Sequence, residues 1–115
     1  MNFTFSISKT EPIAVISLEG NLLSKDSSEL LLTDVDQLAE NGHANFIFDC
    51  TRLKLMNSTG LNVLIQALTH ARRAGGEVVI ACVPSKVREL LLLTRLNAVF
   101  HVFETVEEAE MHLDK

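Results

Sequence analysis

The sequence lacks several features that would assign it to whole classes of protein. It has two cysteines, Cys50 and Cys82, which lie far apart in apolar contexts and form no Cys-x-x-Cys motif. We therefore expect reduced thiols and no disulfide framework. No apolar run approaches the ~20 residues that a membrane span needs, and the N-terminal stretch lacks the basic and apolar regions of a secretory signal. These absences predict a cytoplasmic protein that does not contact a membrane.

Positive charge is also scarce. The formal net charge is -5, the sequence pI is about 5.3, and Arg72-Arg73 is the only adjacent basic pair. A protein that coats a phosphate backbone needs a larger basic surface, so nucleic acid is not an expected partner. The histidines at positions 43, 70, 101 and 112 lack metal-ligand spacing, so neither a metal nor another cofactor is expected.

The composition is instead that of one compact domain. The chain has 115 residues, 47% of them hydrophobic, which is enough for a single core. Because no repeat, low-complexity tract or Pro/Gly-rich linker interrupts it, we expect residues 1–115 to form one domain.

Hydrophobic periodicity predicts a hairpin and a helix in the first part of the chain. Phe3, Phe5 and Ile7 alternate with polar residues, as in a half-buried strand, and Glu11-Pro12 separates this strand from a second one over 13–18. A helix is predicted within 26–42, with a capping box formed by Asp26 and Glu29, a stop at Asn41-Gly42, and apolar positions at Leu30, Leu31, Val35 and Leu38.

Strands and helices then alternate to the end of the chain. The predicted strands cover 45–50, 77–83 and 98–103; the predicted helices cover 58–74, 85–96 and 105–113, the second with Pro84 in its first turn and the last capped by Thr105 with Glu108. Such alternation predicts an α/β fold with a largely parallel sheet, whose functional groups gather where strands end and helices begin.

The segment Asn57-Ser58-Thr59-Gly60 lies at such a place, between two apolar runs. Asn57 or Ser58 can cap the following helix by accepting a hydrogen bond from a free backbone N–H. A hydrolase nucleophile is disfavoured because Met56 stands where the Gly-x-Ser-x-Gly motif needs glycine. A P-loop is disfavoured because only one glycine is present and no Lys-Ser/Thr pair follows. No catalytic residue is therefore assigned, and the residues alone leave open whether Ser58 does more than cap.

Asp49, near the end of the predicted strand 45–50, has two interpretations. A carboxylate at that place is the phosphoacceptor in receiver domains, but the earlier strands supply only Glu19 for the acidic pair that would hold magnesium. The alternative is that Asp49 fixes the following loop by accepting hydrogen bonds from its backbone.

Residues 46–64, FIFDCTRLKLMNSTGLNVL, resemble the signature of STAS domains, and specifically of bacterial anti-sigma factor antagonists. The family pattern is an aspartate, an apolar residue and Ser/Thr, followed six residues later by Asp-Ser-Ser/Thr-Gly-Leu. The residues that match it are Asp49, Cys50, Thr51, Ser58, Thr59, Gly60 and Leu61. The resemblance also covers the order of the predicted elements along almost the whole chain.

This resemblance implies a STAS fold: a mixed, mostly parallel sheet of about five strands with an opening hairpin, and about four helices packed largely on one face. It also implies a binding switch and not an enzyme. In such antagonists the serine that matches Ser58 is phosphorylated by a partner that is both a serine kinase and an anti-sigma factor. The unphosphorylated form captures that partner and frees a sigma factor, and a serine phosphatase restores the serine. A monomer or weak dimer is expected.

The resemblance further implies which residues meet the partner. Ser58 is the expected phosphorylation site, with Thr59 as second choice, and Asp49 and Thr51 are expected to structure the loop. The expected contact residues are Leu23, Ser24, Asp26, Met56, Asn57, Thr59, Gly60, Asn62 and Gln66. Met56 can equally be a core residue that anchors the loop.

Two positions depart from the family pattern. Asn57 stands where the antagonists usually have aspartate, and Leu23 where many have an acid that pairs with the kinase. These departures leave open a STAS interaction module of another regulatory or transporter complex, in which Ser58 is only a helix cap. A receiver that uses Asp49 is the remaining alternative.

Overall fold

A computed structural model describes residues 3–10, 13–24, 29–43 and 45–113. Their elements follow the predicted order. They are β1 (Thr4–Thr10), β2 (Ile13–Leu22), α1 (Glu29–Glu40), β3 (Asn45–Met56), α2 (Ser58–Arg73), β4 (Glu77–Ala81), α3 (Ser85–Leu93), the 3-10 helix η2 (Leu96–Ala98), β5 (His101–Phe103) and α4 (Val106–Leu113).

The strands form one sheet in the order β1-β2-β3-β4-β5. β1 pairs with β2 antiparallel, and every later pair is parallel. This confirms the mixed, mostly parallel sheet with an opening hairpin. Parallel neighbours require crossover helices, and α1, α2 and α3 supply them.

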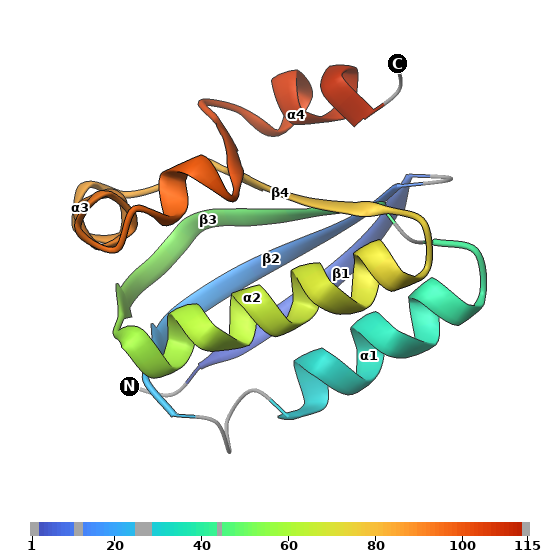
Figure 1. The fold of residues 1–115 in the computed structure, drawn as a ribbon, viewed down its shortest axis with the longest axis horizontal. Helices are drawn as coiled ribbons and strands as arrows, with labels where there is room; N and C mark the ends of the chain where they lie inside the picture. The colour runs from blue at the N-terminus through green and yellow to red at the C-terminus, as the bar shows by residue number, and fades with distance from the viewer. Residues whose placement is uncertain (1–2, 11–12, 25–28, 44, 114–115) are drawn as a thin grey trace.

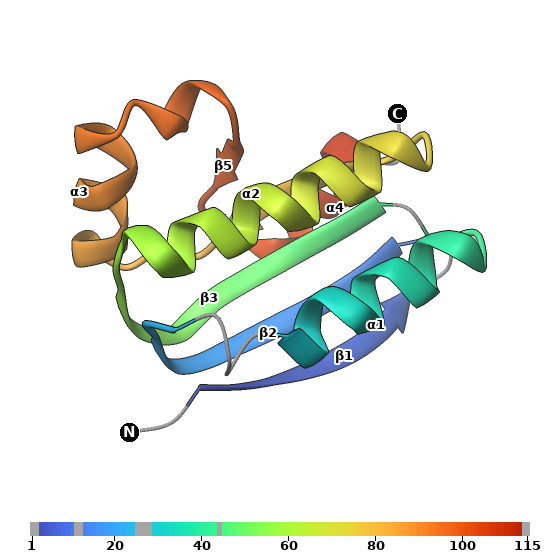
Figure 2. The same ribbon diagram turned by 60° about the horizontal axis from the view of Figure 1, so that its bottom comes forward.

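The helices are divided unequally between the two faces of the sheet (Figures 1 and 2). α1 and α2 lie side by side on one face, where the Asp36 and His70 side chains join them. The main core lies between them and the sheet, and α3 contributes Val87 and Leu91 to it. α4 covers the opposite face, where Ala109 packs on Ile47 and Val79.

Several predicted details require correction. Leu30 does not belong to the core: its side chain is 64% exposed, whereas Leu31 is fully buried one position later. The predicted strand 98–103 is reduced to three residues, because α3 ends in a left-handed residue, Arg95, and η2 follows it. Pro84 precedes α3 as its N-cap and does not lie inside its first turn. The turn at Glu11-Pro12 and the capping role of Asp26 lie outside the described residues.

Both cysteines are free thiols, as the sequence predicts. Cys50 lies in the main core, and this burial, followed by the nearby charge of Asp49, raises the pKa of its thiol. A thiol that stays protonated is a poor nucleophile, so Cys50 acts as a small core residue.

The neighbouring leucines of α1 provide a test of the packing. Leu31→Ala should lower the free energy of unfolding by about 2–5 kcal/mol, because it leaves a cavity in the core. Leu30→Ala should change it by less than about 0.5 kcal/mol, because the removed atoms are already in water. Urea unfolding of both variants in dilute solution measures the difference, and equal losses would contradict the assigned helix orientation.

Candidate functional site

The site is built on a strand that extends further than the sequence predicts. β3 continues seven residues past Asp49 to Met56, so the predicted loop between 50 and 58 is wrong. β3 pairs with β4 only as far as Asp49 and beyond that point pairs with β2 alone, up to Leu22 opposite Met56. Two register shifts, at Ser17/Glu19 and Gly20/Asn21, each place one extra residue in β3. Such bulges bend a strand, and β3 curves away from β4 toward the start of α2 (Figure 1).

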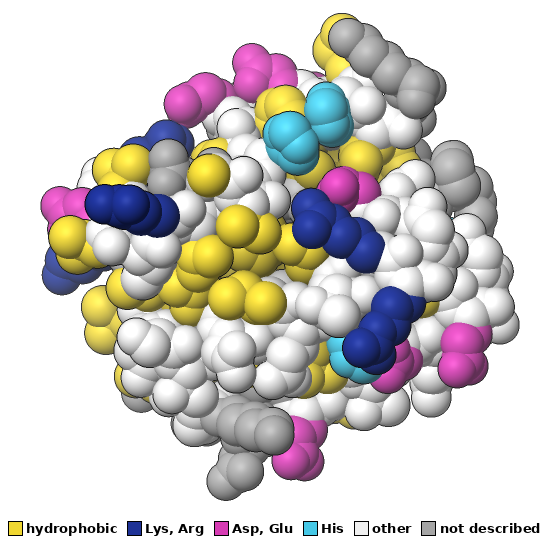
Figure 3. Space-filling view, viewed as in Figure 1, with side chains coloured by type: hydrophobic (Ala, Val, Ile, Leu, Met, Phe, Trp, Pro, Cys, Tyr) yellow, Lys and Arg dark blue, Asp and Glu magenta, His cyan; other side chains and the backbone are white. Residues whose placement is uncertain are grey.

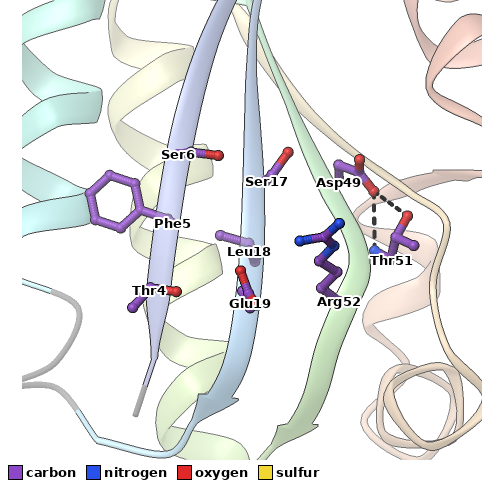
Figure 4. A pocket seen from close by; sticks show the side chains of 9 residues that line it. All are labelled: Thr4, Phe5, Ser6, Ser17, Leu18, Glu19, Asp49, Thr51 and Arg52. Carbon is purple, nitrogen blue, oxygen red and sulfur yellow. Dashed lines mark hydrogen bonds between the residues drawn. The ribbon is translucent and has the colours of Figure 1, made fainter.

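Asp49 fixes the first bulge. One of its carboxylate oxygens accepts hydrogen bonds from the Thr51 backbone N–H (3.1 Å) and the Thr51 hydroxyl (2.6 Å). Asp49 therefore ties the chain that follows it, as expected, although that chain is a bulged strand and not a loop. Figure 4 shows the same pair at the edge of a polar hollow of about 570 Å³ on the sheet face opposite α1, which Glu19 and Arg52 also line.

Asn57 is the N-cap of α2. Its side-chain oxygen accepts a hydrogen bond from the Gly60 backbone N–H (3.0 Å), and its side-chain nitrogen donates one to the Leu23 carbonyl (3.2 Å). The first bond caps the helix, and the second joins the end of β3 to the chain that leaves β2. An aspartate would preserve the cap but could not donate to Leu23. Of the two cap candidates in the sequence, the structure selects Asn57.

Gly60 allows the first turn of α2 to lie directly against β2. A Cβ atom at this position would overlap the Leu22 carbonyl oxygen and would lie 2.9 Å from Met56 Cγ. Gly60 is buried, so its expected place on a partner surface is wrong, and its role is close packing. Met56 is half-buried against the main core, which favours the anchoring role over the contact role.

Ser58 and Thr59 are exposed in the first turn of α2. No hydrogen bond joins the Ser58 hydroxyl to another residue in the part of the chain that the structure describes. The backbone N–H groups of Ser58 and Thr59 have no partner four residues earlier in the helix, because they precede its first intrahelical bond. The hydroxyl and these N–H groups therefore lie together at the positive end of the helix dipole.

A groove of about 450 Å³ adjoins Ser58 and runs between α2 and the segment after α3. Figure 3 shows apolar side chains gathered between these elements. The residues that line the groove are Ser58, Thr59, Leu61, Asn62, Ile65, Thr94 and Leu96, none of them charged.

The structure brings most of the predicted contact residues together and separates a few. Leu23 and Ser24 are exposed beside Asn57, and Asn62 is exposed on α2 one turn after Ser58. Gln66 is half-buried, and Asp26 lies outside the described residues. We call the exposed residues Leu23, Ser24, Ser58, Thr59 and Asn62, together with the adjoining groove, the Ser58 surface.

The sequence did not reveal the far wall of this groove. Thr94 and Leu96 lie more than thirty positions after Ser58 and reach it only because α3 packs beside α2. Leu55, which is 42% exposed, was also missed. Leu55 precedes Met56 in a bulged strand, where simple alternation does not predict which side chains face water.

The model of the STAS domain family matches residues 4–109, which is most of the chain. The chain belongs to the STAS family. Three solved structures show the extent of the structural similarity. The first is a putative anti-sigma factor antagonist from Thermotoga maritima, with a TM-score of 0.86, 18% identity, and coverage of 96% of this chain and 95% of the other.

The second is the anti-sigma factor antagonist SpoIIAA in its unphosphorylated form, with a TM-score of 0.82, 20% identity, and coverage of 96% of both chains. The third is the Bacillus cell fate determinant SpoIIAA in the phosphorylated form, with a TM-score of 0.74, 19% identity, and coverage of 95% of this chain and 98% of the other. At these identities the likeness establishes the fold of this STAS domain. Within its described residues, no helix is long and apolar enough to cross a bilayer.

The close packing at Gly60 yields an unusual prediction of sign. Gly→Ala within a helix ordinarily stabilises by roughly 0.5–1 kcal/mol. Gly60→Ala should instead lower the free energy of unfolding by about 1–3 kcal/mol, because the new methyl group forces the helix away from Leu22. Thr59→Ala, an exposed change in the same turn, is the matched control and should stay within about 0.5 kcal/mol in urea unfolding. A stabilised Gly60→Ala variant would show that the close approach does not exist.

The two hydrogen bonds of Asn57 can be separated by substitution. Asn57→Ala loses both and should cost about 1 kcal/mol or more, whereas Asn57→Asp keeps the cap and should lose less. Thermal unfolding gives the order of stability, and hydrogen exchange of the Gly60 amide reports the cap itself. Faster exchange in Asn57→Asp than in Asn57→Ala would contradict the assigned cap.

Proposed function

We propose that this chain is an anti-sigma factor antagonist that switches partners through phosphorylation of Ser58. In its unphosphorylated form it binds an anti-sigma factor that is also a serine kinase, and a sigma factor is released. The kinase then phosphorylates Ser58 and the complex dissociates; a serine phosphatase reverses the modification. The chain acts as a binding switch in the cytoplasm and performs no catalysis itself.

The observation that carries this proposal is the division of roles between Asn57 and Ser58. Because Asn57 caps α2, the Ser58 hydroxyl is exposed and is not needed to hold the helix. A kinase can modify it without breaking the cap. The alternative in which Ser58 serves only as a helix cap loses its support, since another residue has that role.

The surroundings of Ser58 support the switching step. A phosphoserine carries about -1.5 to -2 charges and three acceptor oxygens. The free N–H groups and the positive end of the α2 dipole favour such an anion within this chain. The groove beside Ser58 is lined by uncharged residues, so a partner that buries it would have to desolvate the new charge without an opposite charge from this chain. Phosphorylation therefore weakens binding and leaves the fold intact.

Asp49 is a poorer candidate for the phosphoacceptor. Its carboxylate already accepts two hydrogen bonds from Thr51 that shape the bulge in β3. A phosphoryl group on that carboxylate would remove an acceptor on which the strand depends.

The experiment incubates the chain with a candidate anti-sigma factor kinase and ATP and locates the phosphate by mass spectrometry. We expect phosphate on Ser58, loss of phosphorylation in Ser58→Ala, and normal phosphorylation in the matched variant Thr59→Ala. In calorimetry, Ser58→Ala should bind the kinase with near-normal affinity, while Ser58→Asp should bind at least tenfold more weakly and still melt within a few degrees of the parent chain. These shifts follow from the added charge alone.

Other outcomes identify the alternatives. An acid-labile phosphate that disappears in Asp49→Asn would identify a receiver. No phosphate and no release of a sigma factor across the cognate kinases would identify a STAS module of a different complex.

A further inference from the structure

The outer edge of β1 has no neighbour among the described elements. β1 is the first strand of the sheet and pairs on one side only, with β2 (Figure 2). On its other side, backbone N–H and C=O groups point outward at each second residue. An edge of this kind can accept an additional strand through backbone hydrogen bonds.

β1 also lacks most of the features that protect an edge from pairing. It is seven residues long, contains no proline and has a single charged residue, Lys9. Its register with β2 runs from Thr4 to Thr10 without a bulge. The opposite edge of the sheet differs, because β5 has only three residues. Short length, charge, proline and bulges are the usual protections, so β1 is the edge that remains open to pairing.

The two sides of β1 differ in chemistry. On the α1 side, Phe5 and Ile7 are half-buried and line a hollow of about 450 Å³ together with Leu30. On the other side the hydroxyls of Thr4, Ser6 and Ser8 are exposed. Figure 4 shows this division: Phe5 points away from the polar hollow that Ser6 and Thr4 line.

We propose that a second copy of this chain pairs with β1 in antiparallel orientation, which joins the two sheets in a weak, symmetric homodimer. A two-fold axis keeps each side of the strand on the same side of the joined sheet. Half-buried Phe5 and Ile7 then meet their counterparts, hydroxyls meet hydroxyls, and the exposed Leu30 of each copy lies beside the joint. A second copy has this matching pattern necessarily, whereas an unrelated strand would need it by coincidence.

The dimer is expected to be weak and dependent on concentration. The contact involves one strand and one exposed helix residue from each copy, which belongs at the small end of protein interfaces. The net charge of -5 on each chain adds repulsion. None of the β1 residues lines the groove beside Ser58, so dimerisation and the proposed switch can be tested independently.

Sedimentation velocity over a wide concentration range tests the proposal. The average mass should rise from that of one chain toward that of two. Ser6→Lys places a charge at the outer edge and should weaken the dimer at least tenfold. Ser17→Lys is the matched control, because Ser17 is the direct cross-strand partner of Ser6 on β2 and is not at the edge. Its dimer should be as strong as that of the parent chain.

A second pair of variants separates the edge from general surface hydrophobicity. Leu30 and Met111 are similarly exposed, at 64% and 68%, on different helices. Leu30→Lys should weaken the dimer, and Met111→Lys should not. Hydrogen exchange should slow with concentration in β1 and stay constant in β5. A parent chain that remains monomeric throughout would overturn the proposal, and so would equal weakening by Ser6→Lys and Ser17→Lys.

Discussion

The parallel pairing of β3 with β2 beyond Asp49 is the constraint on which the site depends. β3 leaves β4 at that residue, follows β2 through two bulges and delivers Met56 opposite Leu22. The start of α2 is then held against β2 by the missing side chain of Gly60 and by the Asn57 amide, which bonds to Leu23. Strand, cap and glycine together fix where the Ser58 hydroxyl points, without using Ser58 itself.

This separation of roles explains how one helix terminus can be both rigid and modifiable. Asn57 satisfies one of the free N–H groups of the first turn, and those of Ser58 and Thr59 stay available to an anion. The arrangement gives a phosphate a favourable electrostatic environment within this chain. It gives no comparable compensation at a buried contact with a partner. An exposed, uncharged groove next to the modified residue is therefore well suited to reversible binding.

The sequence predicted the element order and the site better than the details between them. Local patterns located α2, because its apolar residues recur at helical spacing, and Thr105, whose hydroxyl accepts a bond from the Glu108 N–H. They failed where long-range pairing decides: β3 extends to Met56 because β2 lies beside it, although Thr51, Arg52 and Lys54 resemble loop residues. They also missed Leu96, because its place beside Ser58 depends on how α3 packs.

The alternation of closed and open positions from 57 to 60 bears on how such a site can diversify. Positions 57 and 60 tolerate few residues, since one must both accept and donate a hydrogen bond and the other has no room for a methyl group. Positions 58 and 59 face water and carry no structural duty. Duplicated genes could therefore change partner preference at the two open positions while the fold is inherited unaltered, so that many separate circuits could share one scaffold.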